Sequence, residues 1–254
     1  MLVYPSGVDV SSSALRFLTQ QLRRHRRTIG SRWRRLSAGR QALLTLARLR
    51  VGHTYAQLAS GFGVGTTTAY RYVAEAVELL AALAPSLADA GRTASVKAYL
   101  ILDGALLPID RIAADRPFCS GKHKRHGMNV QAIADPFGRR LWASPVMPGA
   151  VHDVRAAREH GVVVALAEAG IKCWAGKGYR GAGGTVRIPY RGRWETLSAG
   201  QQAANRSHAK IRALGEQAIA TLKAWRLLCE LRCSTTRITS LVQAVLTLHL
   251  TSSE

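Results

Sequence analysis

The sequence predicts an α/β protein in which an all-α N-terminal part precedes a mixed α/β part. Apolar residues recur at helical spacing through residues 37–84, whereas from residue 96 the expected order is strand, hairpin, helix, strand and helix. The chain has 254 residues, 47% of them hydrophobic, which is enough to bury a core in one large domain or two smaller ones.

The first 36 residues combine a short apolar stretch with a dense basic run. Leu18 and Leu22 precede Arg23, Arg24, Arg26 and Arg27. This order predicts a helix that continues into a basic arm over residues 1–36. Two alternatives remain open, an arm that follows the phosphates of DNA and a solvated linker.

Residues 37–90 predict a helix-turn-helix domain. Thr54 and Gln57 match a capping box, so a helix begins there, ends near residues 61–64, and gives way to a second helix from Thr66. The second helix would contact DNA through its early side chains, which are Thr66, Thr67, Thr68, Tyr70 and Arg71. A plain helical pair without a DNA role is the alternative.

The remaining elements follow after Pro85. Residues 86–95 are rich in small side chains and are expected to form a linker. The predicted strands cover residues 97–103, 127–134, 139–146 and 171–175, and the predicted helices cover residues 154–169, 203–231 and 237–250. The turn at residues 135–138 makes the second and third strands a hairpin. We expect one domain over residues 96–254.

The charge of the chain points to a polyanionic partner. The chain holds 36 Lys and Arg against 15 Asp and Glu, a formal net charge of +21. Nucleic acid is the partner that such an excess favours. No apolar stretch is long enough for a membrane span, the N-terminus does not resemble a secretory signal, and no Cys-x-x-Cys pair suggests zinc or redox chemistry. We therefore expect a cytoplasmic protein.

Three acidic residues stand out in the second part of the chain. Asp103 ends a predicted strand, Asp153 begins a predicted helix, and Glu216 lies within another helix. Carboxylates from separate elements of a basic chain are compatible with a divalent-metal phosphodiester site, because two metal ions need carboxylate oxygens to offset their charge. Asp153 could equally be a helix cap, and Glu216 could form a surface ion pair with Arg212.

Five motifs together resemble the DDE superfamily of insertion-sequence transposases, in the group related to Harbinger elements. They are Leu102-Asp103-Gly104, the basic segment 120–131, the Pro-Gly-x-x-His-Asp run that ends at Asp153, Lys-Gly-Tyr at 177–179, and an Arg-Glu-Lys signature formed by Arg212, Glu216 and Lys223.

The resemblance implies a ribonuclease-H-like catalytic domain behind a helix-turn-helix, which would cut and join transposon ends with two Mg²⁺ (or Mn²⁺) ions. Asp103 would bridge both ions and Glu216 would be the last carboxylate. The partner would be double-stranded DNA at the terminal repeats, with a homodimer holding two ends. The residues expected to contact phosphate are Lys122, Lys124, Arg125, Arg212 and Lys223.

One position departs from the family pattern. The second catalytic Asp of the family directly precedes the Lys-Gly-Tyr run, and this chain has Gly176 there. A glycine supplies no oxygen to a metal ion, so strand cleavage is expected to be severely reduced. Asp153 is the candidate substitute. The alternative function is a non-catalytic, sequence-preferring DNA-binding protein derived from a transposase.

Overall fold

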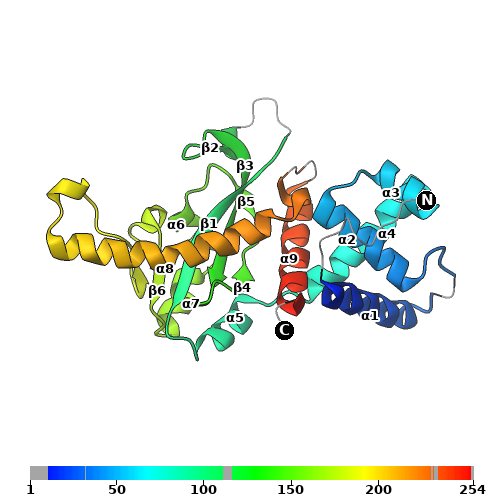
Figure 1. Cartoon of the computed structure of the whole chain (residues 1–254), viewed down its shortest axis with the longest axis horizontal. Helices are drawn as coiled ribbons and strands as arrows, with labels where there is room; N and C mark the ends of the chain where they lie inside the picture. Colours follow the sequence, from blue (N-terminus) through cyan, green and yellow to red (C-terminus); the bar gives the residue numbers. More distant parts are fainter. Residues whose placement is uncertain (1–10, 32, 111–115, 230, 232–233, 253–254) are drawn as a thin grey trace. The chain divides into compact units, whose positions relative to one another are not determined.

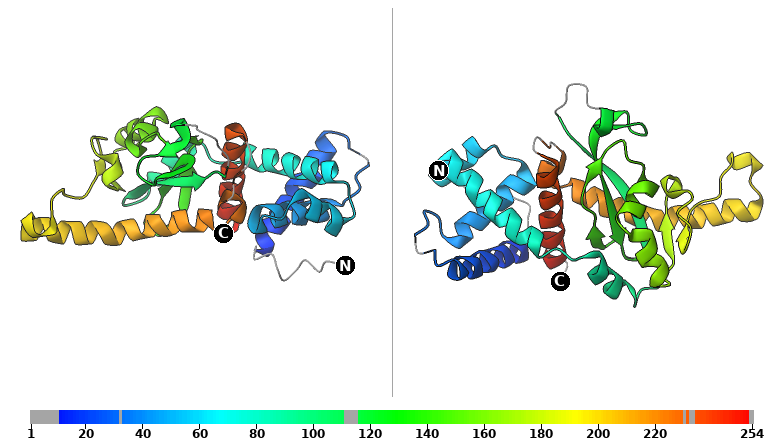
Figure 2. Two further views of the ribbon diagram at one scale, coloured as in Figure 1. Left: turned by 90° about the horizontal axis from the view of Figure 1, so that it is seen from above. Right: turned by 180° about the vertical axis from the view of Figure 1, so that it is seen from behind.

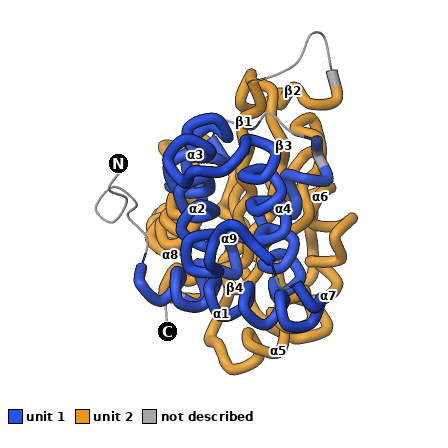
Figure 3. Tube along the Cα trace, turned by 90° about the vertical axis from the view of Figure 1, so that its right-hand side faces the viewer, with its two compact units in different colours: residues 1–84, 222–254 blue, residues 85–221 orange. Residues whose placement is uncertain are grey.

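The structure is a computed structural model that describes residues 11–31, 33–110, 116–229, 231 and 234–252. The chain forms two compact units (Figure 3). Unit 1 comprises residues 1–84 and 222–254, and unit 2 comprises residues 85–221. This division differs from the expected one at the C-terminus, because the last helix packs with the N-terminal helices rather than with the sheet.

Unit 1 is helical. Its elements are α1 (Ser12–Thr28), α2 (Ala38–Val51), α3 (Tyr55–Phe62), α4 (Thr66–Ala82), the short 3-10 helix η4 (Arg226–Cys229) and α9 (Thr235–Ser252). Helix α9 packs against α4 and α1, and the hydroxyl of Thr247 donates a hydrogen bond of 2.9 Å to the carbonyl oxygen of Leu80. None of the described helices of the chain is long and apolar enough to cross a membrane.

The expected basic arm is, in its described part, a packed helix. Leu18 and Leu22 of α1 are fully buried, and α1 lies against α2. Residues 1–10 of the expected arm and Arg32 lie outside the described residues. An amphipathic helix of this kind contributes to the core through its apolar side and leaves Arg23, Arg24 and Arg27 exposed.

The helix-turn-helix is formed by α3 and α4, as expected. Thr54 caps α3 through the predicted capping box with Gln57. Gly63 ends α3 with a φ of +67°, a conformation that favours glycine, and Gly65 precedes the first turn of α4. The tight connection follows from these glycines.

The expected linker at residues 86–95 is wrong. These residues form α5 (Leu87–Ala94), which begins at a second capping box between Ser86 and Asp89. Ala90 and Ala94 are buried, and α5 packs against α7 (Val162–Glu168) and strand β4 (Arg140–Ala143). Small side chains here allow close packing of a helix, which composition alone does not distinguish from a linker.

Unit 2 contains a mixed sheet. Its described strands are β1 (Leu100–Pro108), β2 (Cys119–Ser120), β3 (Arg125–Ala134), β4 (Arg140–Ala143), β5 (Met147–Pro148), β6 (Cys173–Ala175) and β7 (Val186–Arg187). The order is β2-β3-β1-β6-β7, with β4 and β5 also paired to β3. Strand β1 is antiparallel to β3 and parallel to β6, and the predicted hairpin of β3 and β4 is confirmed.

Short helices connect these strands, and a long one follows them. They are the 3-10 helices η1 (Arg116–Phe118), η2 (Lys177–Tyr179) and η3 (Trp194–Thr196), and the helices α6 (Asp153–Glu159), α7 and α8 (Ala199–Lys223). The single helix expected at residues 154–169 is divided in two, because Gly161 has a φ of +72° between α6 and α7. Figure 1 shows α8 running along the sheet.

The two faces of the sheet carry different helices (Figure 2). Alternate residues of β1 point to opposite faces. Ile101 packs with Ala134 and with Ala218 of α8, whereas Leu100 and Leu102 pack into the larger core that includes residues of α5, α6 and α7. Asp103 lies within β1 rather than at its end, because the strand continues to Pro108. Its side chain therefore belongs to the α8 face.

Candidate functional site

The α8 face brings together Asp103, Gly176, Arg212 and Glu216. Leu102 of β1 pairs with Ala175 of β6, and continuing this register by one residue places Gly176 beside Asp103. A Cβ atom built on Gly215 of α8 would lie 3.9 Å from the Cβ of Asp103. This face therefore gathers the first and last carboxylates suggested by the sequence, together with the position that departs from the family pattern.

Arg212 lies against Gly176. A Cβ atom built on Gly176 would lie 3.3 Å from both Cζ and Nη2 of Arg212. The same Nη2 donates a hydrogen bond of 3.0 Å to Oε1 of Glu216, one turn further along α8. The guanidinium therefore occupies the space that a side chain at position 176 would enter, and it pairs with one of the two acids of this face.

The electrostatics of this face centre on Asp103. Burial raises the pKa of the Asp103 carboxyl, the Arg212 guanidinium opposes that rise, and the charges of Glu216 and Asp153 add to it. A raised pKa means that the fold disfavours the ionised form of this carboxyl.

The sequence analysis missed His208, which is buried on α8 beside β6. Its Nε2 forms a hydrogen bond of 2.9 Å with the carbonyl oxygen of Ala175, and its ring meets Trp174 edge-on at 5.0 Å. Burial lowers the pKa of His208. The neutral imidazole thus fastens α8 to the strand end that precedes Gly176.

Asp153 lies on the opposite face of the sheet from Asp103. A Cβ atom built on Gly104 would lie 2.5 Å from Oδ1 of Asp153, and one built on Gly178 would lie 2.6 Å from Oδ2. Gly104 follows Asp103 in β1, so the two residues face opposite sides. The structure therefore separates Asp153 from the pair formed by Asp103 and Glu216.

A chain of hydrogen bonds holds Asp153 in place. Asn129 Nδ2 donates to Oδ1 of Asp153 at 3.0 Å, Gln131 Nε2 donates to Oδ1 of Asn129 at 2.6 Å, and the hydroxyl of Tyr179 donates to Oε1 of Gln131. Burial raises the pKa of Tyr179 well above its ordinary value, so the phenol stays protonated and remains a donor. Asn129 and Gln131 alternate along β3, a polar period of two within an apolar strand that could have revealed this network.

The Lys122 Nζ also pairs with Oδ2 of Asp153 at 3.3 Å. Lys122, Lys124 and Arg125 are exposed around the connection between β2 and β3. Lys124 has a φ of +52°, an uncommon conformation for a residue with a side chain.

The residues present do not fit a two-ion metal site. Among the described residues, no group of three or more His, Cys, Asp or Glu side chains is arranged to hold a metal ion. On the α8 face Glu216 is paired to Arg212, position 176 has no oxygen, and a guanidinium stands beside it. A cation in that space would meet the positive charge of Arg212.

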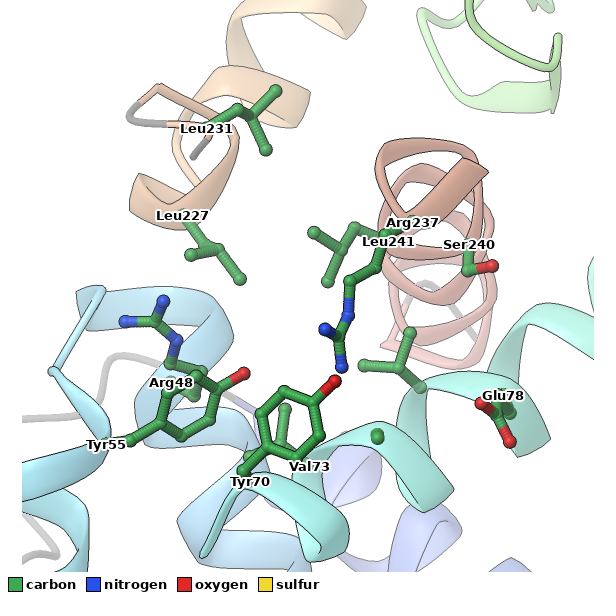
Figure 4. A pocket seen from close by; sticks show the side chains of 12 residues that line it. Arg48, Tyr55, Tyr70, Val73, Glu78, Leu227, Leu231, Arg237, Ser240 and Leu241 are labelled. Carbon is green, nitrogen blue, oxygen red and sulfur yellow. The ribbon is translucent and has the colours of Figure 1, made fainter. Parts of the chain in front are cut away.

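In unit 1, the start of α4 presents the side chains expected to contact DNA. Thr66, Thr67 and Arg71 are exposed and Thr68 is half-buried. Tyr70, 39% exposed, lines a cavity of about 300 Å³ (Figure 4). The guanidinium of Arg237 lies 4.4 Å from the centre of the Tyr70 ring. Tyr70 is therefore held by packing on one side.

The arginines of α1 divide into two kinds. Arg23, Arg24 and Arg27 are exposed. Arg26 is turned inward, where its Nη2 donates to the carbonyl oxygen of Leu36 at 3.0 Å and to Oε1 of Gln41 at 2.6 Å. Burial lowers the pKa of Arg26. Its contacts join α1 to α2, whereas the other three are available to a ligand. Lys223, the last residue of α8, is also exposed.

Comparisons with known proteins agree with these features. Residues 102–249 match the family model described as "DDE superfamily endonuclease", and residues 34–86 match "Helix-turn-helix of DDE superfamily endonuclease". A protein of Streptomyces albus G named "Putative transposase for insertion sequence element IS112" is 32% identical over 199 residues, which are 76% of this chain and 71% of that protein. No solved structure matches the chain. The chain belongs to the DDE superfamily of transposases, with an N-terminal helix-turn-helix.

Proposed function

We propose that this chain binds transposon ends through unit 1 and that strand cleavage by unit 2 is severely reduced. The observation that carries the proposal is the guanidinium of Arg212 against Gly176, where the family pattern has a carboxylate. The chain would then act as a sequence-preferring DNA-binding protein built on a transposase fold.

The chemistry explains the expected loss. Proteins of this superfamily use divalent metal ions, and Mg²⁺ (or Mn²⁺) is held by carboxylate oxygens that offset its charge. The α8 face offers Asp103, whose pKa burial raises, and Glu216, which forms an ion pair with Arg212. Because position 176 is a glycine, Arg212 adds a positive charge where a negative one is needed. The remaining capacity of this face is to bind a phosphate group through Arg212.

The binding role rests on unit 1. The exposed start of α4 offers hydroxyl groups and Arg71 to base edges, and Arg23, Arg24 and Arg27 offer charge to the phosphate backbone. Double-stranded DNA at transposon terminal repeats is the proposed partner. Holding two ends would bring two copies of the chain together, and the setting would be the bacterial nucleoid.

Asp153 is not the proposed substitute for the missing carboxylate. Its location beside Gly104 and its hydrogen bond from Asn129 support a structural role. If Asp153 did replace the missing residue, the wild-type chain would cut DNA and Asp153→Asn would abolish cutting.

The test is Mg²⁺-dependent nicking of a duplex that carries the cognate inverted repeat. The wild-type chain should stay near background, and Gly176→Asp should raise the rate by about 100-fold or more, since an effect of about 3 kcal/mol is expected of one electrostatic catalytic group. Gly176→Asn, similar in shape but uncharged, is the matched control and should stay near background. Equally strong cutting by the wild type and Gly176→Asp would overturn the proposal.

A further inference from the structure

Unit 2 contains a cationic groove outside the α8 face described above. It has a volume of about 460 Å³, and its lining includes the apolar residues Ile188 and Pro189 and the cations Lys177, Arg180, Arg191 and Arg193. All four cations are exposed. No acidic residue lines the groove, and no described acid forms an ion pair with any of the four. Four cations in one hollow whose lining includes no acid favour the binding of an anionic ligand.

The segment that carries two of these cations is fixed before any ligand binds. We name residues 188–197 the arginine strap. Asn205 of α8 makes two hydrogen bonds to the backbone of Tyr190, donating at 3.1 Å and accepting at 2.8 Å. Gln202 donates to the carbonyl oxygens of Trp194 at 2.9 Å and Leu197 at 3.1 Å. A pinned strap loses less conformational freedom on binding.

Gly192 sets the spacing between Arg191 and Arg193. Its φ is +152°, and a Cβ atom there would lie 2.9 Å from Cδ2 of Leu197. Glycine is therefore required at this bend, which keeps both arginines on the lining of the groove.

The position and composition of the groove indicate its ligand. Lys177 directly follows Gly176, so the groove begins next to the α8 face that holds Asp103 and Glu216. Tyr190 and Trp194, which are 53% and 45% exposed, lie on the same strap. Exposed aromatic rings among arginines are typical of surfaces that bind nucleic acid, where the cations contact phosphates and the rings contact sugars or bases.

We propose that the groove of Lys177, Arg180, Arg191 and Arg193 binds the phosphodiester backbone of a DNA strand next to Gly176. Unit 2 therefore has its own DNA contact, independent of the helix-turn-helix. This inference rests on the proposed function, in that DNA is the partner of the chain, and it adds a second site of contact.

The experiment measures binding of the full chain to a labelled mixed-sequence duplex over a series of salt concentrations. Each phosphate contact contributes about 0.9 to the slope of log affinity against log salt. Arg191→Gln with Arg193→Gln should therefore make the slope shallower by about 1.8. Arg191→Lys with Arg193→Lys keeps the charge and should retain most of the slope.

The matched control removes two exposed cations elsewhere in unit 2. Arg92 lies on α5 and Lys172 directly precedes β6. Arg92→Gln with Lys172→Gln lowers the net charge equally and should leave the slope close to that of the wild type. A groove variant that behaves like this control overturns the inference.

A further variant separates the inference from the proposed function. Arg23→Gln with Arg24→Gln should also reduce the slope if α1 contacts DNA. A wild-type chain without salt-dependent duplex binding would overturn the proposed function itself. Groove variants that bind DNA normally but lose affinity for polyglutamate would overturn the inference and indicate an acidic protein partner instead.

Discussion

The acidic residues on the two faces of the sheet in unit 2 lie in opposite environments, one enclosed and one exposed. On one face Asp153 is enclosed by Gly104 and Gly178 and fixed by a hydrogen-bonded chain that ends at buried Tyr179. On the other face Glu216 is 60% exposed and contacts Arg212, whose guanidinium borders Gly176. The enclosed face is built for stability, whereas the open face has the exposure that a reaction with DNA requires.

The largest difference between the faces should come from removing each acid. Asp153→Ala leaves Asn129 Nδ2 without one acceptor and should lower the free energy of unfolding by about 3 kcal/mol, the upper range for hydrogen bonds to charged groups. Glu216→Ala is the matched control. It removes only an exposed ion pair and should change the free energy of unfolding by about 0.5 kcal/mol or less. Urea denaturation of both variants measures this. Equal losses would contradict the distinction between the faces.

Two glycines provide a second comparison. Gly104→Ala puts a methyl group 2.5 Å from Oδ1 of Asp153, within a network that cannot shift freely, and should cost about 2 kcal/mol. Gly176→Ala meets only the flexible end of Arg212 at 3.3 Å and should cost far less. Thermal unfolding of the two variants beside the wild type measures these losses of stability. A greater loss for Gly176→Ala would mean that Arg212 is rigidly held.

The pH dependence of stability tests the fastening of α8 to β6. Burial lowers the pKa of His208 below its ordinary value of 6.5, so the fold favours the neutral ring. Its contribution is present above pH 6.5 and is lost as the pH falls through the lowered pKa. His208→Gln, which retains a hydrogen-bond donor, should reduce the loss of stability that the wild type shows between pH 7 and pH 5. The urea midpoints of the wild type and the variant, measured at pH 7 and pH 5, test this. If the difference between the two pH values were the same in both proteins, His208 would not be the source of the pH dependence.

The smallest expected effect is a gain in stability. Asp103→Asn removes a carboxyl whose ionised form the fold disfavours, so the variant should be slightly more stable than the wild type at neutral pH. The gain in stability should vanish as the pH falls below 3.8, the ordinary pKa of an aspartate, because this carboxyl is then protonated in both the folded and the unfolded wild type. Calorimetry at pH 7 and 3 measures it. A loss of stability at pH 7 would show that the attraction of the Arg212 charge for the ionised carboxyl outweighs the cost of its burial.

Local patterns predicted much of the fold. The capping box at Thr54, the glycine turn and the hairpin all depend on neighbouring residues, and the structure has them. Helix α5 was missed because alanines and glycine are compatible with both linkers and packed helices. The assignment of α9 to unit 1 was missed because it depends on contacts such as Thr247 with Leu80, far apart in the sequence.

The candidate site was predicted in part. The motifs indicated Asp103, Gly176 and Glu216, and the structure gathers these positions on one face. Alternation along β1 indicates that Asp103 and Gly104 face opposite sides of the sheet, but the location of Asp153 beside Gly104 depends on a contact between segments far apart in the sequence. The inward turn of Arg26 and the position of Arg212 against Gly176 depend on side-chain packing, which residue spacing does not specify.

The composition of unit 1 from both ends of the chain has a consequence for biosynthesis. Helix α9, which packs against α4 and α1, leaves the ribosome after the whole of unit 2. Until then the apolar side of α4 lacks its partner, so a nascent or prematurely terminated chain cannot complete the core of unit 1. Unit 1 is therefore completed only once α9 has been translated, and under the proposed function a chain truncated before α9 should bind transposon ends more weakly than the full chain.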